Sequence, residues 1–413
     1  MNFQKPKGTE DFYPEDKETQ QAIFAKVKSV AKRYNFREVE TPAFEELKLL
    51  TQKQGDEIKS QIFLLEKRSS EEFGLRFDLT VPLTRLFVQK QRELQKPVKW
   101  FCVDKMWRYE QPQKGRQREF YQFDVEMLGS SEPESDAEII NLMISCVKEL
   151  GLTSSDVVMK INNRYLLQGL LSDFVSEEKF SSVLGIIDKF EKLSRDAFVA
   201  ELELLNVDAK RIIKIITTKS LDELEKQFEG KKFSEMASLG LENIKKVFSF
   251  VSKEFVELSL STVRGLAYYT GTVFEMFDRQ GKFRAVCGGG RYDNLVEQYG
   301  GEKTPAVGVG MGYSTLLLLL EDRGLLPPQM KRVDYYVAVL SDDVRTEALN
   351  LVEKLRVRNV VETDFVKRSF SKQLQYANTI GASKLIVIGI DEVKRGKYKI
   401  KDLGSGSEEE VSF

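Results

Sequence analysis

The chain has 413 residues, of which 41% are hydrophobic and 31% are charged, a composition typical of a globular protein with two or three domains. The 63 Lys and Arg nearly balance the 64 Asp and Glu, which excludes a globally basic protein that wraps nucleic acid but leaves a locally basic face open. Three cysteines without a close pair exclude a disulfide framework and a cysteine-cluster zinc site, and they indicate a reducing compartment.

The sequence contains no histidine. Histidine general bases, Ser–His–Asp triads and histidine metal ligands are therefore excluded. Any chemistry must use carboxylates, Arg, Lys, Tyr, backbone groups, a metal ion or the substrate itself. The polar amino terminus and the short apolar run Leu316–Leu320 predict neither a signal peptide nor a membrane span, so we expect a cytoplasmic protein.

The first two thirds of the chain alternate between helical and strand-rich regions. Apolar residues at helical spacing predict an amphipathic helix over residues 17–34. A strand-rich stretch follows through about Gly129, and the pattern is again helical over Asp136–Leu150. Lys- and Glu-rich sequence with helical spacing then predicts a helical insertion at about residues 166–255. Strand and glycine signals return at Ser259–Gly312.

A linker and a second domain complete the chain. The breakers in Gly324–Pro328 predict the linker. Beyond it, the pattern alternates between strands and helices, at Tyr335–Leu340, Asp343–Arg356, Val360–Phe365, Lys372–Ile380 and Lys384–Ile390. This alternation predicts a small α/β domain with a largely parallel sheet. We expect the acidic tail Glu408–Glu410 to be a solvated end.

A polar row along one predicted strand is the first candidate site. Side chains alternate between the two faces of a strand, so one face carries Phe120, Gln122, Asp124 and Glu126 and the other Tyr121, Phe123, Val125 and Met127. The connection from the preceding strand, which ends at Trp107–Glu110, carries cations that suit a polyphosphate, namely Lys114, Arg116 and Arg118. The alternative is an ordinary surface hairpin with a solvated polar face.

Two further motifs contain polar groups suited to a small ligand. Asp78 and Thr80 lie two residues apart in a predicted strand and would point the same way, which suits an ammonium group. The alternative is an Asp–Thr turn. Arg264, Tyr268 and Tyr269 are bracketed by glycines before a predicted strand at Thr272–Phe277, and one Arg with two Tyr is unusual in a plain loop.

Two glycine-rich motifs follow. Cys287–Asp293 comes after a predicted strand at Phe283–Val286, and its glycines either let a ligand approach the backbone or form a bulge or tight turn. Gly308, Gly310 and Gly312 precede an apolar run in a predicted strand and helix. This set is not a P-loop, because no Gly-Lys-Ser/Thr follows, and it lacks the context of a dinucleotide fold.

The order of these motifs resembles a class II aminoacyl-tRNA synthetase, and specifically the histidyl-tRNA synthetase family. Lys7–Phe12 resembles the family's amino-terminal start, Val39–Pro42 its motif 1, and Trp107–Glu126 its motif 2. Arg264–Tyr269 and Cys287–Asp293 resemble the two signatures peculiar to the histidine enzymes. The resemblance covers essentially the whole chain and is weakest across about 170–250.

The resemblance implies a fold and a domain organisation. Residues 1–326 would form an α+β catalytic domain of the class II type, built on a mostly antiparallel sheet with the helical insertion at about 166–255. Residues 333–413 would form an α/β anticodon-binding domain. The proline-ended motif 1 would build the interface of a homodimer.

The resemblance also implies roles for single residues. The histidine site would comprise Asp78, Leu79, Thr80, Arg108, Gln122, Glu126, Arg264, Tyr268 and Tyr269. The ATP site would comprise Arg108, Glu110, Arg116, Arg118 and Phe120. Arg108 and Arg264 would be catalytic, Glu126 and Tyr269 would read the imidazole, and Asp78, Thr80 and Gln122 would hold the α-ammonium. No residues are expected to form a metal site of their own, so Mg²⁺ would arrive with ATP.

Three positions differ from the family's usual motifs. Ala267 replaces an Asp, Thr315 stands where an Arg of motif 3 usually packs against ATP, and Asn163 stands where a His is common. We interpret Asn163 as structural. We expect Arg116, Arg118 and backbone groups to supply the ATP contacts of the missing Arg.

Two functions remain open on these motifs. The first is a ligase that joins histidine to tRNA(His) through histidyl-adenylate, at the cost of ATP. The second is a catalytically silent paralogue that acts as a regulatory subunit of ATP phosphoribosyltransferase. The missing motif 3 Arg favours the paralogue, whereas the complete amino-acid pocket, the motif 2 cations, Arg264 and the second domain favour the ligase.

Overall fold

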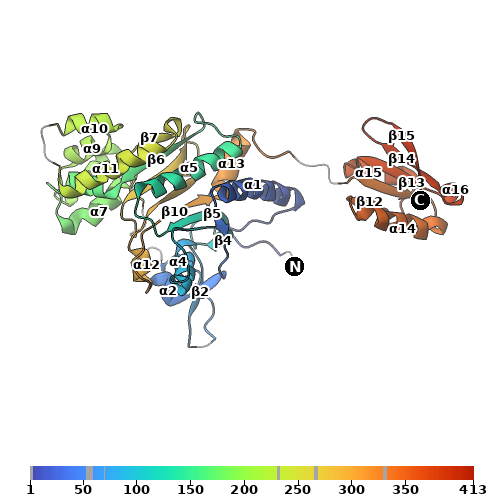
Figure 1. Cartoon of the computed structure of the whole chain (residues 1–413), viewed down its shortest axis with the longest axis horizontal. Helices are drawn as coiled ribbons and strands as arrows, with labels where there is room; N and C mark the ends of the chain where they lie inside the picture. Colours follow the sequence, from blue (N-terminus) through green and yellow to red (C-terminus); the bar gives the residue numbers. More distant parts are fainter. Residues whose placement is uncertain (1–2, 53–58, 69, 230–232, 265–267, 329–332) are drawn as a thin grey trace. The chain divides into compact units, whose positions relative to one another are not determined.

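The computed structural model describes residues 3–52, 59–68, 70–229, 233–264, 268–328 and 333–413 (Figure 1). The chain divides into two compact units, Met1–Pro327 and Pro328–Phe413. The boundary between them falls inside the breaker-rich segment Gly324–Pro328. None of the described helices is both long and apolar enough to cross a lipid bilayer.

The first unit is built on an eight-stranded sheet with the strand order β1-β4-β5-β10-β9-β8-β6-β7. The strands are β1 (Arg37–Glu38), β4 (Val98–Trp107), β5 (Glu119–Leu128), β6 (Val157–Asn163), β7 (Val256–Leu258), β8 (Thr272–Asp278), β9 (Cys287–Arg291) and β10 (Ala306–Gly312). Only the edge pairs β1–β4 and β6–β7 are parallel. The other neighbouring pairs are antiparallel, which confirms the predicted mostly antiparallel sheet.

Helices cover one face of this sheet, and the polar row of β5 lies on the other face. The covering helices are α1 (Pro14–Arg33), α5 (Pro133–Glu149) and α13 (Tyr313–Asp322) (Figure 1). Phe123, Val125 and Met127 join the main core beneath these helices. Strand alternation therefore places Gln122, Asp124 and Glu126 on the opposite face, as the sequence predicted.

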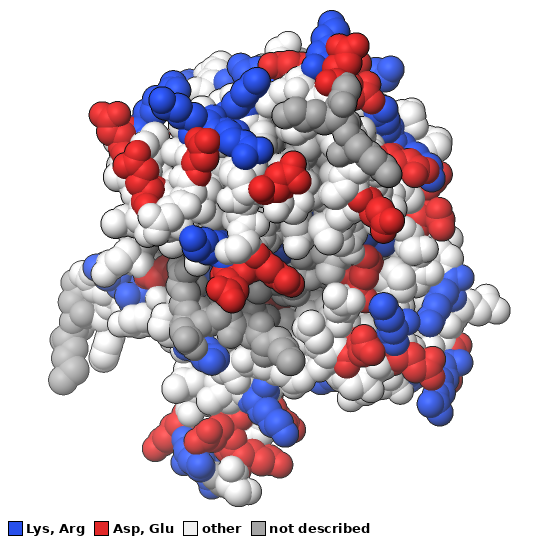
Figure 2. Space-filling model, turned by 90° about the vertical axis from the view of Figure 1, so that its left-hand side faces the viewer, with Lys and Arg blue, Asp and Glu red and all other residues white. Residues whose placement is uncertain are grey.

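The predicted helical insertion is confirmed as a run of short helices. They are α6 (Arg164–Leu171), α7 (Glu177–Ile187), α8 (Arg195–Leu204), α9 (Ala209–Ile216), α10 (Leu221–Gln227), α11 (Glu235–Phe250) and the 3₁₀ turn η1 (Lys253–Phe255). Gly169 of α6 and Gly240 of α11 let the two helices approach closely, because a Cβ at either position would overlap the backbone of the other helix. Cationic and anionic side chains are interspersed on this side of the unit (Figure 2).

Two sequence predictions of local structure in this unit were wrong. Thr80 is the first residue of helix α4 (Thr80–Lys90) and does not lie in a strand. The glycine-rich Cys287–Arg291 is itself the buried strand β9, whereas the structure has no strand at Phe283–Val286. Glycine has low strand propensity, and here pairing with β8 and β10 on both sides overrides that preference.

Smaller elements complete the first unit. The strands β2 (Phe44–Glu46) and β3 (Phe73–Leu75) form a separate antiparallel pair. The helices α2 (Leu47–Thr51) and α12 (Leu295–Gln298) lie in the connections.

The second unit is an α/β domain with the strand order β12-β11-β13-β14-β15. Its elements are β11 (Tyr335–Val339), η2 (Asp342–Val344), α14 (Arg345–Arg356), β12 (Val361–Thr363), α15 (Phe370–Thr379), β13 (Lys384–Ile388), α16 (Ile390–Arg395), β14 (Lys397–Asp402) and β15 (Glu408–Ser412). β11, β12 and β13 are parallel, and β14 and β15 are antiparallel. The acidic residues Glu408–Glu410 are exposed, as expected of a solvated end. They also belong to the edge strand β15, in which Glu410 lies 3.2 Å from Lys397 across the pair.

Candidate active site

Glycines of β10 form the floor beneath the polar row of β5. The strand register places Gly308 opposite Glu126, Gly310 opposite Asp124, and Gly312 opposite Gln122. A Cβ at Gly308 would overlap the Glu126 carboxylate, and a Cβ at Gly310 would overlap the side-chain amide of Gln122. The polar side chains therefore occupy space that any residue larger than glycine would fill.

Glu126 is buried in the site, with 1% of its surface exposed. Its Oε1 accepts a hydrogen bond from Thr80 Oγ1 at 2.7 Å, and its Oε2 accepts one from the Tyr292 hydroxyl. Burial raises the pKa of Glu126 to about 8, although both hydroxyl donors favour its ionised form. The strand β5, the start of α4 and the end of β9 thus jointly fix this carboxylate.

Two more carboxyl groups and one guanidinium surround Glu126. Burial, followed by repulsion from Glu126 and Asp78, raises the pKa of Asp124 well above its usual value. Burial also raises the pKa of Asp78, and attraction to Arg108 opposes this shift only in part. Asp78 Oδ1 accepts the backbone N–H of Val81 at 3.1 Å in the first turn of α4. A cluster of carboxyl groups of this kind favours a cationic ligand.

Arg264 approaches the site from the segment before β8. Its guanidinium forms an ion pair with Glu275 of β8 and lies over Gly288, where a Cβ would overlap it. Burial opposes the charge of this guanidinium, but Glu275 and Tyr269 outweigh that effect and raise its pKa. The φ of Arg264 is +60°, a left-handed conformation that is uncommon for a residue with a side chain. Such backbone strain is often found at functional sites.

Three tyrosines line the site beside Glu126. The rings of Tyr268 and Tyr269 lie 4.8 Å apart, and the rings of Tyr268 and Tyr292 lie 5.7 Å apart. Tyr269 and Tyr292 are buried. The site therefore combines aromatic surface with a carboxylate, an arrangement that suits a planar ring bearing an N–H group.

The segment that carries Arg264 and Tyr269 is held by Arg164 of α6. Arg164 donates hydrogen bonds to the backbone oxygens of Tyr269 at 2.6 Å and of Arg264 at 3.4 Å. Asn163 is the N-cap of α6, because its Oδ1 accepts the backbone N–H groups of Tyr165 and Leu166. The interpretation of Asn163 as structural is confirmed.

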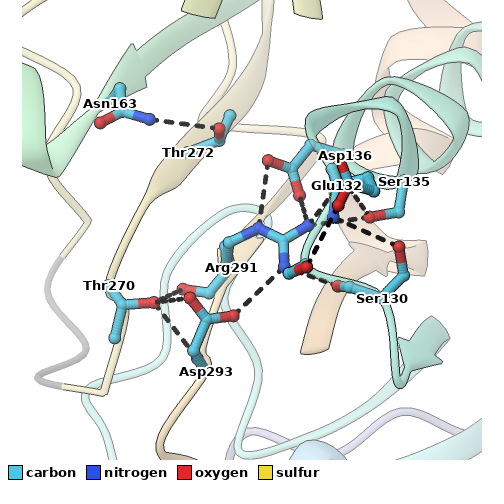
Figure 3. A network of polar contacts seen from close by, with 10 residues as sticks. Ser130, Glu132, Ser135, Asp136, Asn163, Thr270, Thr272, Arg291 and Asp293 are labelled. Carbon is cyan, nitrogen blue, oxygen red and sulfur yellow. Dashed lines mark hydrogen bonds and ion pairs between the residues drawn. The ribbon is translucent and has the colours of Figure 1, made fainter. Parts of the chain in front are cut away.

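A buried network centred on Arg291 fixes the other end of this segment (Figure 3). Arg291 pairs with Asp136 at 2.6 Å and with Asp293 at 3.2 Å. Thr270 donates its backbone N–H to the Arg291 oxygen at 2.8 Å and its hydroxyl to Asp293 at 3.2 Å. The remaining contacts of Arg291 are Ser130, Glu132 and Ser135. Arg291 is therefore a structural residue that anchors β9 and Thr270 to the start of α5.

The motif 2 hairpin places its cations beside aromatic rings and a carboxylate. The Arg108 guanidinium lies 5.3 Å from the centre of the Phe120 ring, and its Nε donates to the backbone oxygen of Phe77 at 2.9 Å. Arg116 forms an ion pair with Glu110. Arg118 donates to the Glu110 backbone oxygen at 2.9 Å and packs 4.1 Å from the centre of the Tyr109 ring.

Thr315 of α13 lies beside this hairpin. A Cβ at Gly115 would be 3.5 Å from Thr315 Oγ1. The hairpin loop therefore runs past the position where the family's motif 3 usually has an Arg. Ala267, the other difference from the family's motifs near the site, lies outside the described residues.

Most of the predicted site residues lie around Glu126 and Arg108, and the structure adds others. The side chain of Leu79 is buried in a core cluster with Leu83, Cys102 and Met106, so only its backbone is available to a ligand. Sequence reasoning missed the roles of Tyr292, Glu275 and Arg164. Tyr292 lies inside the glycine-rich motif Cys287–Asp293, whereas no motif points to Glu275 or Arg164.

Comparisons with known proteins agree with this geometry. Residues 8–316 match the family described as Histidyl-tRNA synthetase, and residues 334–413 match the Anticodon binding domain. The histidine–tRNA ligase of Natronomonas pharaonis is 39% identical to this chain, over 98% of this chain and 95% of that protein. The chloroplastic/mitochondrial histidine–tRNA ligase of Arabidopsis thaliana is 37% identical, over 100% of this chain and 86% of that protein.

A solved structure shows the same fold. The histidyl-tRNA synthetase from Nostoc sp. PCC 7120 superposes with a TM-score of 0.81 at 29% identity, covering 100% of this chain and 97% of that one. The family match covers well over half of the chain, and the two ligases above match it along 95% and 86% of their own length. This chain therefore belongs to the histidyl-tRNA synthetase family.

Proposed function

We propose that this protein is a histidine–tRNA ligase that activates histidine with ATP and transfers it to the 3′ end of tRNA(His). The observation that carries this function is the buried Glu126 carboxylate, fixed by Thr80 and Tyr292 over a glycine floor. A buried carboxylate accepts a hydrogen bond from an imidazole N–H. The guanidinium groups of Arg108 and Arg264 can bind carboxylate and phosphate oxygens.

We assign the histidine contacts as follows. Glu126 accepts one imidazole N–H, Tyr269 meets the other ring nitrogen, and Tyr268 lines the pocket. Asp78, Thr80 and Gln122 hold the α-ammonium, with the backbone of Leu79 beside them. The carboxyl groups around this position favour a positive charge, which supports the assignment.

The ATP contacts come from the motif 2 hairpin. Phe120 stacks on the adenine, and Glu110, Arg116 and Arg118 bind the remainder of the nucleotide. Arg108 bridges the histidine carboxylate and the α-phosphate, and Arg264 binds the α-phosphate from the other side. The ion pairs of Arg116 with Glu110 and of Arg264 with Glu275 hold these guanidinium groups before ATP arrives.

This assignment needs no enzyme histidine. The histidine carboxylate is already ionised, attacks the α-phosphorus of ATP and displaces pyrophosphate, so positioning and charge stabilisation suffice. A terminal ribose hydroxyl of the tRNA then attacks the carbonyl carbon and displaces AMP, whose phosphate accepts the proton. Mg²⁺ would arrive on the ATP phosphates and neutralise their charge, since the described residues include no group of three or more Cys, Asp or Glu placed to hold a metal.

The regulatory paralogue is the less favoured alternative. The relatives that match this chain along 86% and 95% of their own length are named as ligases. Histidine-dependent exchange of pyrophosphate into ATP separates the two functions. The ligase is expected to catalyse this exchange, and a purified protein that binds histidine without exchange would contradict the proposed function.

We further propose that the protein is a homodimer that acts in the cytoplasm, and that the second unit binds the anticodon region of tRNA(His). The match of residues 334–413 to the Anticodon binding domain supports the latter assignment. The dimer is supported by the resemblance of Val39–Pro42 to motif 1.

Removal of the second unit tests this division of labour. A chain that ends at Leu326 is expected to retain most histidine-dependent pyrophosphate exchange and to lose most tRNA charging, because the proposed catalytic residues all lie in the first unit. Both rates are compared with those of the full chain after circular dichroism has shown that the truncated chain is folded. Equal loss of both activities in a folded truncation would contradict the division.

Substitutions at Thr315 and Arg116 test how ATP is bound without the motif 3 Arg. Thr315→Ala is expected to change the KM for ATP only a few-fold. Arg116→Ala should raise the KM for ATP by a larger factor, because a charge-assisted contact is worth about 1.5–3 kcal/mol. Arg92→Ala, which removes an exposed Arg outside the hairpin, serves as the control. A large effect of Thr315→Ala with little effect of Arg116→Ala would reverse the assignment.

The pH dependence of histidine activation tests the protonation state of Glu126. The pKa of Glu126 is about 8, so the group holds its proton below this value in the free protein. kcat/KM for histidine is therefore expected to rise with pH through about 8 as the accepting carboxylate forms. Glu126→Gln should abolish this rise, whereas the inflection of the free substrate imidazole near about 6.5 should persist. A rise near pH 8 that survives in Glu126→Gln would exclude Glu126 as its source.

A further inference from the structure

Asp124 is a buried carboxyl group to which the proposed reaction assigns no role. It lies on β5 between Gln122 and Glu126, on the same face of the sheet, with 2% of its surface exposed. Its Oδ1 accepts a hydrogen bond from Nε2 of Gln122. The described part of the chain places no cation in an ion pair with it. Its position over Gly310 puts the Asp124–Gln122 contact directly against the β10 backbone.

The direction of this hydrogen bond decides which atom Gln122 has left for a ligand. A glutamine side chain has one donor end, the NH₂ group, and one acceptor end, the carbonyl oxygen. An ammonium group can only donate, so it needs the acceptor end. Since Asp124 accepts from Nε2, the oxygen Oε1 of Gln122 remains to accept from an ammonium group.

We propose that Asp124 is a positioning residue, which orients the Gln122 amide so that its Oε1 accepts a hydrogen bond from the α-ammonium of histidine; this role rests on the proposed function. Without Asp124 the amide could rotate and present its NH₂ group to the ammonium. Two donors facing each other would leave both without an acceptor, which costs binding energy in a buried site.

The charges around Asp124 are compatible with this role. The groups that face it are the carboxyl groups of Glu126 and Asp78, the Gln122 amide and the Arg108 guanidinium. The buried Cys102 thiol on the neighbouring strand β4 also faces it. Burial, with repulsion from the two carboxyl groups, keeps the pKa of Asp124 high. One oxygen of a carboxyl group accepts a hydrogen bond whether or not the other carries a proton. The contact with Gln122 therefore holds in both states.

Two inhibitors show whether Asp124 orients the Gln122 amide or only stabilises the structure of the pocket. Histidinol carries the amine but no carboxylate, and imidazolepropionate carries the carboxylate but no amine. Asp124→Ala is expected to raise the inhibition constant of histidinol about tenfold or more, the loss expected for a charge-assisted hydrogen bond, and to change that of imidazolepropionate less than about twofold. Asp124→Asn, which keeps the accepting Oδ1, should retain most of the histidinol affinity.

A second pair of variants tests the same contact without changing Asp124. Gly310→Ala places a methyl group where Gln122 and Asp124 meet. It should therefore raise the inhibition constant of histidinol and leave that of imidazolepropionate nearly unchanged, the same result as expected for Asp124→Ala. Gly185→Ala in helix α7, away from the site, is the matched control, because its added Cβ has no atom within 4 Å. Gly310→Ala also provides the test should Asp124→Ala fail to fold.

The outcomes distinguish this role from the proposed function. Wild-type protein without histidine-dependent pyrophosphate exchange would contradict the proposed function itself. Wild-type exchange with equal weakening of both inhibitors in Asp124→Ala or Gly310→Ala would overturn the positioning role, as would unchanged binding of both inhibitors. Selective loss of the amine-bearing inhibitor, restored in Asp124→Asn, would support it.

Discussion

Glu126→Ala is expected to raise the KM for histidine and to lower kcat/KM by orders of magnitude, with the KM for ATP nearly unchanged. A site built to hydrogen-bond a ring N–H discriminates by about 10⁴–10⁵ against analogues that lack it. In Glu126→Ala the hydroxyl groups of Thr80 and Tyr292 also lose their common acceptor. The variant therefore loses both the carboxylate and the hydrogen bonds that fix these two side chains. Steady-state pyrophosphate exchange at varied histidine and varied ATP measures both parameters.

A glycine variant displaces the same carboxylate without removing it. A Cβ at Gly308 would overlap Glu126, so Gly308→Ala is expected to impair histidine use in the same direction, while Gly185→Ala in helix α7 should have little effect. Circular dichroism and thermal unfolding show whether each variant is folded. Near-normal histidine activation by a folded Glu126→Ala would remove the imidazole-reading role and weaken the case for histidine as the substrate.

Arg264→Ala is expected to lower kcat for adenylate formation by about 10²–10³, the usual cost of losing one group that stabilises charge in the transition state. The KM for histidine should change only modestly, because the guanidinium acts mainly after binding. Rapid-quench measurement of histidyl-adenylate separates this chemical step from product release.

Arg264→Ala also breaks the ion pair with Glu275, so a double variant is needed to separate lost stability from lost catalysis. Arg264→Ala leaves the Glu275 carboxylate largely buried without its cation, which destabilises the fold independently of catalysis. Arg264→Ala/Glu275→Ala removes both charges and is expected to be more stable than the single variant but just as slow. Arg279→Ala, which breaks an exposed pair with Glu257, is the control. A double variant with wild-type kcat would contradict a catalytic role for Arg264.

The polar row of β5 could be predicted from the sequence because its cause is local. Strand alternation alone placed Gln122, Asp124 and Glu126 on one face and Phe123 on the other. The same local rule failed at Thr80, where the residues that follow Asp78 continue as a helix. Even so, Asp78 and Thr80 both lie in the site, because the first turn of α4 is directed at Glu126.

The partners of the site residues could not be predicted, because they come from distant parts of the chain. Tyr292 reaches Glu126 across 166 positions of sequence, and Arg164 reaches Tyr269 across 105. No spacing or periodicity connects such residues. The strand β9 was missed for a related reason: its glycines are disfavoured in strands, and only the neighbours β8 and β10 make that conformation favourable.

The glycine floor also limits how the pocket can change. On the β10 side the Glu126 and Gln122 side chains lie against main-chain atoms of a central strand that is hydrogen-bonded to a neighbour on each side. A main-chain surface has no rotamers, so it cannot move aside to give these two side chains a different position. Glycine is already the smallest residue, so every substitution at Gly308 or Gly310 can only reduce the space above the strand. Evolution of this protein toward a bulkier substrate would therefore have to proceed through the side chains on the opposite side of the pocket.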